Sequence, residues 1–120
     1  MTSAVLLVSS DLFFISKIKE AAANCSLQVV VARSQVALEK ALLEAQGSKG
    51  LFIIDLEKVT APLEFLSRIV AELSGRGWSC ISFFSHVHLE TAAQAEALAL
   101  GEVMPRSRFV KVLPDLLASL

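Results

Sequence analysis

Short apolar runs alternate with amphipathic segments from one end of the chain to the other. The apolar runs are AVLLV at 4–8, LQVVVA at 27–32, LFII at 51–54, CISFF at 80–84 and EVM at 102–104. A short apolar run bounded by polar residues is typical of a strand that is buried on both faces, as in a parallel sheet. The pattern therefore predicts five strands.

The segments between these runs have apolar residues at helical spacing. Helices are predicted over 12–23, from Ser34 onward, over 63–73, over 90–100 and from Pro114 to the end of the chain. Asp11 or Ser10 is the expected N-cap of the first helix, and Pro114 suits the first turn of the last one. No repeat or linker divides the chain, so residues 1–120 are expected to form one domain.

Strands that alternate with helices predict an α/β protein in which a parallel sheet has helices on both faces. Right-handed crossover connections restrict the topology to a doubly wound sheet. At this length we expect a (βα)5 three-layer α/β/α sandwich, with a five-stranded parallel sheet in the flavodoxin-like order 2-1-3-4-5.

Composition and charge argue against several classes of protein. The chain is 54% hydrophobic and 19% charged, which is ample material for a core. Its eleven basic and twelve acidic residues give a net charge of −1, so no nucleic-acid partner is indicated. No apolar run approaches the ~20 residues of a membrane helix, and the N-terminus lacks the basic region of a signal peptide. Cys25 and Cys80 are interpreted as reduced thiols of a cytoplasmic protein.

Polar residues that follow three of the predicted strands indicate a functional edge of the sheet. Asp55 ends the third apolar run, Ser85 ends the fourth, and Arg108 follows the fifth. Open α/β sheets place their binding sites at the carboxyl ends of the strands. We therefore expect an acid, a hydroxyl and a cation to converge on one site.

In the order and spacing of these residues the chain from Ala4 to Leu120 resembles a response-regulator receiver domain, the phosphoacceptor module of two-component signalling. In that family an aspartate ends the third strand, a Ser or Thr ends the fourth and a Gly ends the fourth helix. Asp55 in IIDLE, Ser85 in SFFS and Gly101 in ALALG match these places. The segments SDLFF, FSHV and VMPRSRF are more narrowly similar to a divergent group of stand-alone receiver-like proteins. The resemblance implies that Asp55 is a candidate phosphoacceptor, with Ser85 and Arg108 beside it.

The resemblance also implies Mg²⁺, which the family holds with an acidic pair after the first strand. Reading from the first apolar run places Ser9 and Ser10 in the acidic positions, whereas counting back from Asp55 places Ser10 and Asp11 there. At least one carboxylate is absent on either alignment, and a hydroxyl brings no charge to the metal. We therefore expect weak Mg²⁺ binding, with Asp11 and Asp55 as ligands.

The cation also departs from the family pattern, in which a lysine precedes a proline. The aligned residue here is Arg108, whose planar guanidinium does not replace a lysine point charge without rearrangement. Arg106 is a competing candidate, because Pro105 can shift the register. His86 stands where the family usually has a small residue, and it either crowds the pocket or donates a hydrogen bond into it. The chain has no tyrosine, so the family's switch aromatic is expected to be absent.

By resemblance, partner contacts are expected on the fourth helix, the fifth strand and the last helix. Ala93, Ala97, Leu98 and the segment 110–113 would then meet a histidine kinase, a downstream target or a second copy of the chain. Small residues leave a flat helix surface that another backbone can approach. The same alanines are equally well explained by high helix propensity.

Three functions are consistent with these observations. The first is an atypical single-domain response regulator, or pseudo-receiver, which is not an enzyme and acts through protein–protein contacts with weak or no phosphorylation. The second is a working receiver in which a histidine kinase phosphorylates Asp55 with Mg²⁺ and Arg108 or Arg106 binds the phosphoryl group. The third is a small-ligand binder on the flavodoxin-like scaffold, although SSDLFF has hydroxyls but no glycine for a phosphate loop.

Overall fold

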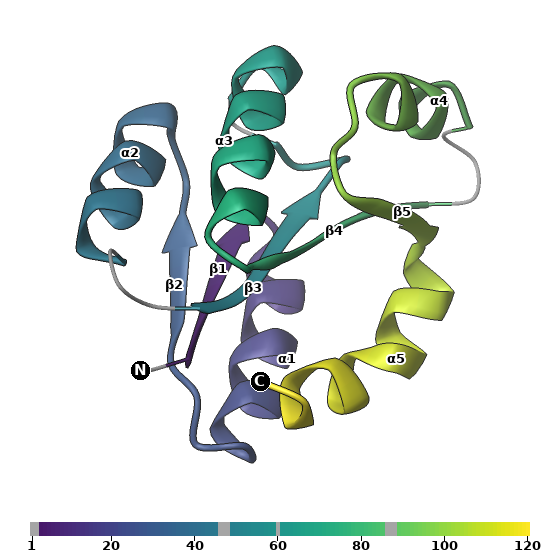
Figure 1. Ribbon diagram of the computed structural model, residues 1–120. Coiled ribbons are helices and arrows are strands. Elements are labelled where there is room, and N and C mark those ends of the chain that lie inside the picture. Colours follow the sequence, from purple (N-terminus) through teal and green to yellow (C-terminus); the bar gives the residue numbers. More distant parts are fainter. Residues whose placement is uncertain (1–2, 46–48, 60, 86–88) are drawn as a thin grey trace.

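A computed structural model of the chain describes residues 3–45, 49–59, 61–85 and 89–120. Within these ranges five strands alternate with five helices (Figure 1). In chain order the elements are β1 (Ser3–Val8), α1 (Leu12–Ala23), β2 (Val29–Ala32), α2 (Gln35–Glu44), β3 (Lys49–Asp55), α3 (Leu63–Gly75), β4 (Ser79–Phe84), α4 (Leu89–Ala97), β5 (Glu102–Pro105) and α5 (Arg106–Ala118).

All strands are parallel and lie in the order β2-β1-β3-β4-β5, as predicted. The central strand β3 pairs with β1 on one side and with β4 on the other. Val8 lies opposite Ile54, and Asp55 lies opposite Phe83. This register places the residue after β1, the last residue of β3 and the residue after β4 at the same edge of the sheet.

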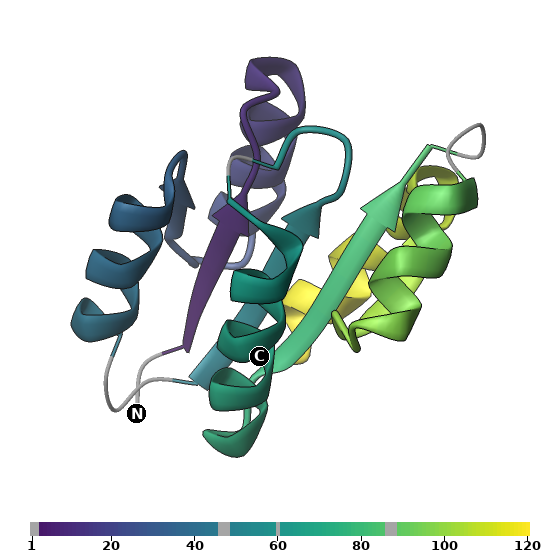
Figure 2. The same cartoon turned by 90° about the horizontal axis from the view of Figure 1, so that it is seen from above.

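Helices cover both faces of the sheet, which confirms the three-layer prediction (Figure 2). Alternate residues of β1 point to opposite faces, because successive side chains of a strand do so. Val5 and Leu7 pack with buried side chains of α1 and α5, whereas Leu6 and Val8 pack with those of α2, α3 and α4. Residues 51–55 of β3 are all buried, which explains their continuous apolar pattern.

The prediction for the last helix was wrong. A helix was expected to begin at Pro114, but α5 begins at Arg106 and has Pro114 in its interior. Pro105 stands at the N-cap with extended backbone angles (φ −63°, ψ 150°). Buried Phe109, Leu113 and Leu117 are spaced four residues apart, so they form one continuous apolar stripe that holds the helix on the sheet across the proline.

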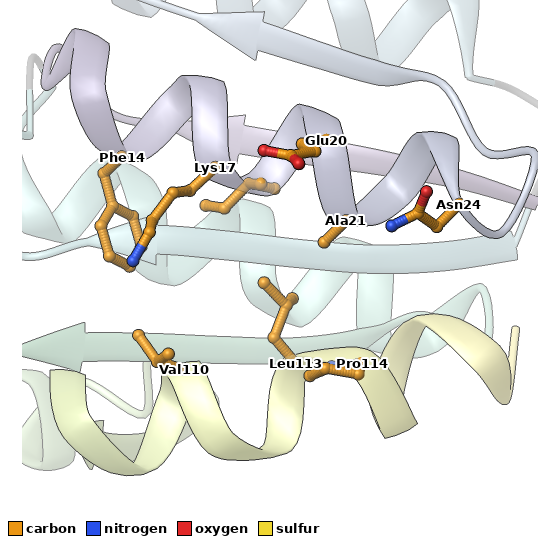
Figure 3. A pocket seen from close by; sticks show the side chains of 9 residues that line it. Phe14, Lys17, Glu20, Ala21, Asn24, Val110, Leu113 and Pro114 are labelled. Atoms are coloured by element: carbon orange, nitrogen blue, oxygen red, sulfur yellow. The ribbon is translucent and has the colours of Figure 1, made fainter.

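A hollow of about 240 Å³ lies between α1 and α5 (Figure 3). Phe14, Lys17 and Ala21 line it from α1, and Leu113 and Pro114 line it from α5. Its walls are mostly aliphatic and aromatic. The hollow therefore marks where these two helices separate on their shared face of the sheet.

Several other boundaries differ from the prediction by one to three residues, among them those of β2 and α4. β2 begins at Val29 rather than at residue 27, and α4 ends at Ala97 rather than at residue 100. The end of α4 follows from the backbone, since Ala99 and Gly101 have positive φ angles of 54° and 78°. Hydroxyls of Ser67 in α3 and Ser82 in β4 donate to the carbonyls of Leu98 and Leu100, each at 2.6 Å, and fix this turn.

No helix in the described part of the chain is long and apolar enough to span a membrane.

Candidate functional site

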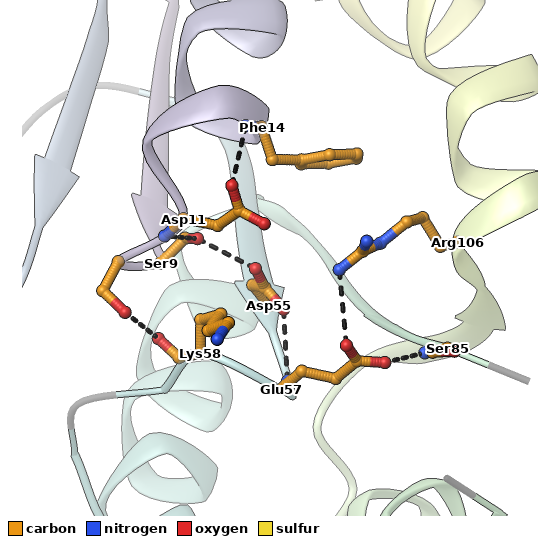
Figure 4. Close-up of polar contacts among 9 residues, drawn as sticks. Ser9, Asp11, Phe14, Asp55, Glu57, Lys58, Ser85 and Arg106 are labelled. Carbon is orange, nitrogen blue, oxygen red and sulfur yellow. Dashed lines mark hydrogen bonds and ion pairs between the residues drawn. The ribbon is translucent and has the colours of Figure 1, made fainter. Parts of the chain in front are cut away.

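Polar residues from four segments meet at the carboxyl edge of the central strands (Figure 4). Ser9 directly follows β1, Asp55 ends β3, Ser85 directly follows β4, and Arg106 opens α5. Glu57 lies two residues beyond Asp55 in the loop toward α3. The parallel register brings these residues together, as expected for Asp55 and Ser85.

Asp55 is completely buried and both of its carboxylate oxygens accept hydrogen bonds. The Ser9 hydroxyl donates to Oδ2 at 2.9 Å, and the backbone N–H of Glu57 donates to Oδ1 at 3.1 Å. Burial raises the pKa of Asp55 above its ordinary value, because the charged form loses its hydration. The Ser9 and Glu57 hydrogen bonds and the nearby Arg106 charge oppose this rise in pKa, while the Glu57 charge adds to it.

Ser9 is the serine that enters the site. It is fully buried, and its Oγ also accepts the backbone N–H of Asp11 at 3.1 Å. Ser10 is exposed, and its hydroxyl donates to the carbonyl of Lys58 at a long distance of 3.5 Å. The register explains the difference, since Val8 pairs with Ile54 and the next residues, Ser9 and Asp55, come side by side.

Asp11 has a structural partner of its own. Its Oδ1 accepts the backbone N–H of Phe14 at 3.2 Å, which makes Asp11 the N-cap of α1. This was one of the two N-caps predicted for that helix. A side-chain oxygen in this position satisfies one of the unpaired donors of the first helical turn.

Glu57 was not identified from the sequence, yet it connects most of the site. Its Oε1 accepts the backbone N–H of Ser85, and its Oε2 lies 3.5 Å from Arg106 Nη2. Both oxygens are therefore engaged. The only sequence signal was its position two residues after Asp55, where a side chain can return to the same sheet edge.

Arg106, not Arg108, is the cation that reaches the site. Its guanidinium carbon lies 5.1 Å from the centre of the Phe14 ring and 5.8 Å from that of Phe83, so the side chain rests on two buried rings. Arg108 is 65% exposed and lies 3.8 Å from Glu102. The prediction that placed Arg108 in the site was wrong in position, because α5 begins at Arg106 and a residue two places later is turned about 200° around the helix.

Ser85 lies beside Glu57 and lines a cavity next to Arg106. His86, the remaining candidate, lies outside the described residues, and so does His88.

The donor set does not suit Mg²⁺ as it is placed. Asp11 and Asp55 were the predicted ligands. Oδ1 of Asp11 and both oxygens of Asp55 accept hydrogen bonds, and the Glu57 carboxylate is shared between Ser85 and Arg106. Across the ranges that the structure describes, no three His, Cys, Asp or Glu side chains gather into a group that could hold a metal. The group beside Asp55 is the uncharged hydroxyl of Ser9. A second carboxylate in this place would add the negative charge that Mg²⁺ favours.

Comparison with protein-family models, with curated proteins and with solved structures found no match. The fold and the polar site are therefore the basis for any functional assignment.

Proposed function

We propose that this chain is a pseudo-receiver, an atypical single-domain response regulator that acts through protein–protein contacts with weak or no phosphorylation. The observation that carries this proposal is the closed hydrogen-bond network around Asp55. The position of this aspartate at the end of the central strand of a 2-1-3-4-5 sheet supports a receiver-like origin. Its surroundings argue against efficient phosphotransfer.

Phosphorylation would require an oxygen of Asp55 to attack a phosphorus atom while the bond from phosphorus to its leaving group breaks. Each oxygen accepts one hydrogen bond and keeps a free lone pair, but the carboxylate is completely buried, so the groups that cover it must first move aside. Catalysis of phosphoryl transfer depends mostly on positioning and on neutralising charge. Arg106 is the nearby cation, and Glu57 already offsets its charge.

Contacts with a protein partner are proposed for the surface of α4, β5 and α5. Ala93, Ala97 and Val110 are exposed there, and Leu98 is half-buried. Leu113 was predicted to belong to this surface, but it is buried against the sheet and cannot contact a partner. A histidine kinase, a downstream target and a second copy of the chain are the candidate partners.

The phosphoacceptor alternative rests on one specific observation. Burial raises the pKa of Asp55, but the Arg106 charge lies close enough to oppose this rise, as a cation that served a phosphoryl group would. In this alternative a phosphodonor would displace Glu57 from Arg106. A binder of small ligands at Asp55 has no comparable support, because the carboxylate is fully buried.

Intact-protein mass spectrometry after incubation with acetyl phosphate separates these functions. The wild type and Asp55→Asn should both remain largely unmodified, with or without Mg²⁺. A single phosphoryl adduct that requires both Mg²⁺ and Asp55, and that reaches most of the protein, would refute the pseudo-receiver proposal. Circular dichroism of both proteins confirms that they are folded.

A second variant, Ser9→Asp, tests whether Ser9 occupies the place of a metal-binding acid. The substitution sets a carboxylate beside Asp55, and two close carboxylates repel each other unless a cation lies between them. The melting temperature of Ser9→Asp should therefore rise with Mg²⁺, while that of the wild type should not. Equal responses of the two proteins to Mg²⁺ would contradict this assignment.

A further inference from the structure

A basic cavity of about 520 Å³ lies beside the site, at the junction of β5 and α5. Among the residues that the structure describes, its lining contains two cations, two hydroxyls and two apolar side chains, and no carboxylate. The residues are Ser85, Pro105, Arg106, Ser107, Val110 and Lys111.

Helical spacing gives the α5 wall of this cavity two distinct strips. Arg106 and Val110 are four residues apart, and so are Ser107 and Lys111, so each pair lies on one side of the helix. One strip combines a guanidinium with an aliphatic side chain, and the other combines a hydroxyl with an ammonium. The cavity therefore offers hydrogen-bond donors beside an apolar surface.

Arg106 has hydrogen-bonding capacity that its known partner does not use. Its Nη2 makes a long contact of 3.5 Å to Glu57, and its buried Nε finds no acceptor among the described residues. The rings of Phe14 and Phe83 hold the guanidinium in place, but they supply no oxygen or nitrogen acceptor for the Nε–H group. A positioned cation with an unused buried donor favours an anionic acceptor.

Lys111 adds a second positive charge. It is exposed, and among residues 3–45, 49–59, 61–85 and 89–120 no carboxylate lies within ion-pair distance of it. Glu57 is the acidic group that contacts residues of the cavity, through Arg106 and the backbone N–H of Ser85. An anion in the cavity would compete with Glu57 for Arg106.

We propose that this cavity binds a small organic phosphomonoester. The phosphate accepts hydrogen bonds from Arg106, Lys111 and the hydroxyls of Ser85 and Ser107, and the organic group lies against Pro105 and Val110. A phosphate suits this lining because its several oxygens can accept from a guanidinium, an ammonium and hydroxyls together. The cavity shares Ser85 and Arg106 with the site around Asp55, but Asp55 does not line it, and the proposal does not depend on phosphorylation of that residue.

The test is an NMR titration of the ¹⁵N-labelled full chain with phenyl phosphate, with inorganic phosphate and with sodium chloride at matched ionic strength. Phenyl phosphate should produce saturable shifts at the amides of Ser85, Ser107 and Lys111, with a dissociation constant on the order of 1 mM. Inorganic phosphate should bind more weakly because it has no group for the apolar wall. Equal affinity for both would refute the assignment to an organic phosphomonoester, and shifts reproduced by chloride would refute the site itself.

Three variants connect the shifts to this cavity. Lys111→Ala removes an exposed cation and should weaken phenyl phosphate binding about two- to fivefold. Arg108→Ala is the matched control, since it removes an exposed cation of the same helix that does not line the cavity, and it should leave the affinity unchanged. Equal losses in the two variants would show attraction to the general charge of α5 and would overturn the proposal.

Glu57→Gln provides the most specific result, because it predicts a gain. The substitution removes the competitor for Arg106 and a negative charge beside the cavity, so binding should tighten about two- to tenfold. A role of Glu57 in structure alone predicts no gain. Unchanged or weaker binding in this variant, with its spectrum still that of a folded protein, would contradict the competition on which the proposal depends.

Discussion

Replacing Ser9 by alanine tests the central contact of the site. The wild-type Ser9 hydroxyl donates to Oδ2 of Asp55 at 2.9 Å and accepts the backbone N–H of Asp11 at 3.1 Å. Both side chains of the Ser9–Asp55 pair are completely buried. Ser9→Ala therefore leaves a buried carboxylate oxygen without a donor, and water has no direct access to replace the hydroxyl.

The expected loss follows from the kind of hydrogen bond that is removed. A hydrogen bond to a charged group contributes about 1.5–3 kcal/mol, and an unsatisfied buried group carries a penalty of similar size. We expect Ser9→Ala to lower the free energy of unfolding by about 2–3 kcal/mol. Since domains of this kind have stabilities of about 5–15 kcal/mol, the variant should still fold.

Urea unfolding followed by fluorescence of Trp78, the single tryptophan and a buried one, measures this loss. At a slope of about 1–3 kcal/mol per molar urea, the midpoint should fall by about 0.7–3 M. Ser10→Ala is the matched control, because Ser10 is exposed and its contact is long, and its effect should stay within about 0.5 kcal/mol. In an Asp55→Asn background the Ser9→Ala loss should shrink, since the charged acceptor is gone. Equal midpoints for Ser9→Ala and Ser10→Ala would refute the reasoning.

Three further predictions concern the remaining structure. Burial raises the pKa of Asp55, so the folded protein keeps the carboxyl proton to higher pH than the unfolded chain does. The free energy of unfolding should therefore fall as pH rises from about 4 through the raised pKa. Urea unfolding at a series of pH values measures this fall, and Asp55→Asn should abolish it. Gly101→Ala should lower the free energy of unfolding by about 2–4 kcal/mol, because φ at this position is 78° and a Cβ would lie 2.3 Å from the Cys80 carbonyl oxygen. Thermal unfolding measures the loss, and an unchanged melting temperature would contradict it. Pro114→Ala should raise the free energy of unfolding by about 1–3 kcal/mol, since the new backbone N–H can bond to the Val110 carbonyl. Hydrogen exchange at residue 114 of the variant should then be slow. A less stable variant would show that the proline is needed for packing.

The fold was predictable because periodicity and sheet order depend on local pattern and general rules. The apolar run before Asp55 is continuous because both faces of β3 are covered, and this pattern is visible without any knowledge of its neighbours. The placement of Asp55 and Ser85 at one edge follows from parallel pairing alone. These parts of the site needed no side-chain geometry.

The parts that were missed depend on positions of one or two residues. The choice between Arg106 and Arg108 was decided by where α5 begins, and Pro114 falsely indicated a later start. The choice between Ser9 and Ser10 was decided by the register of β1 against β3. Glu57 was missed because its side chain turns back from a loop, and no periodic pattern reports the direction of a loop side chain.

The two outer strands of the sheet differ in how they are protected from pairing with another chain. β5 carries Glu102 at its start and Pro105 at its end, and a charge and a proline both oppose the addition of a further strand. β2 has the sequence VVVA, without a charge or a proline, and Val30 on it is 43% exposed. Its shortness and the Arg33 that follows are its protection. Aggregation of this protein at high concentration should therefore begin at β2, and Val30→Lys should suppress it.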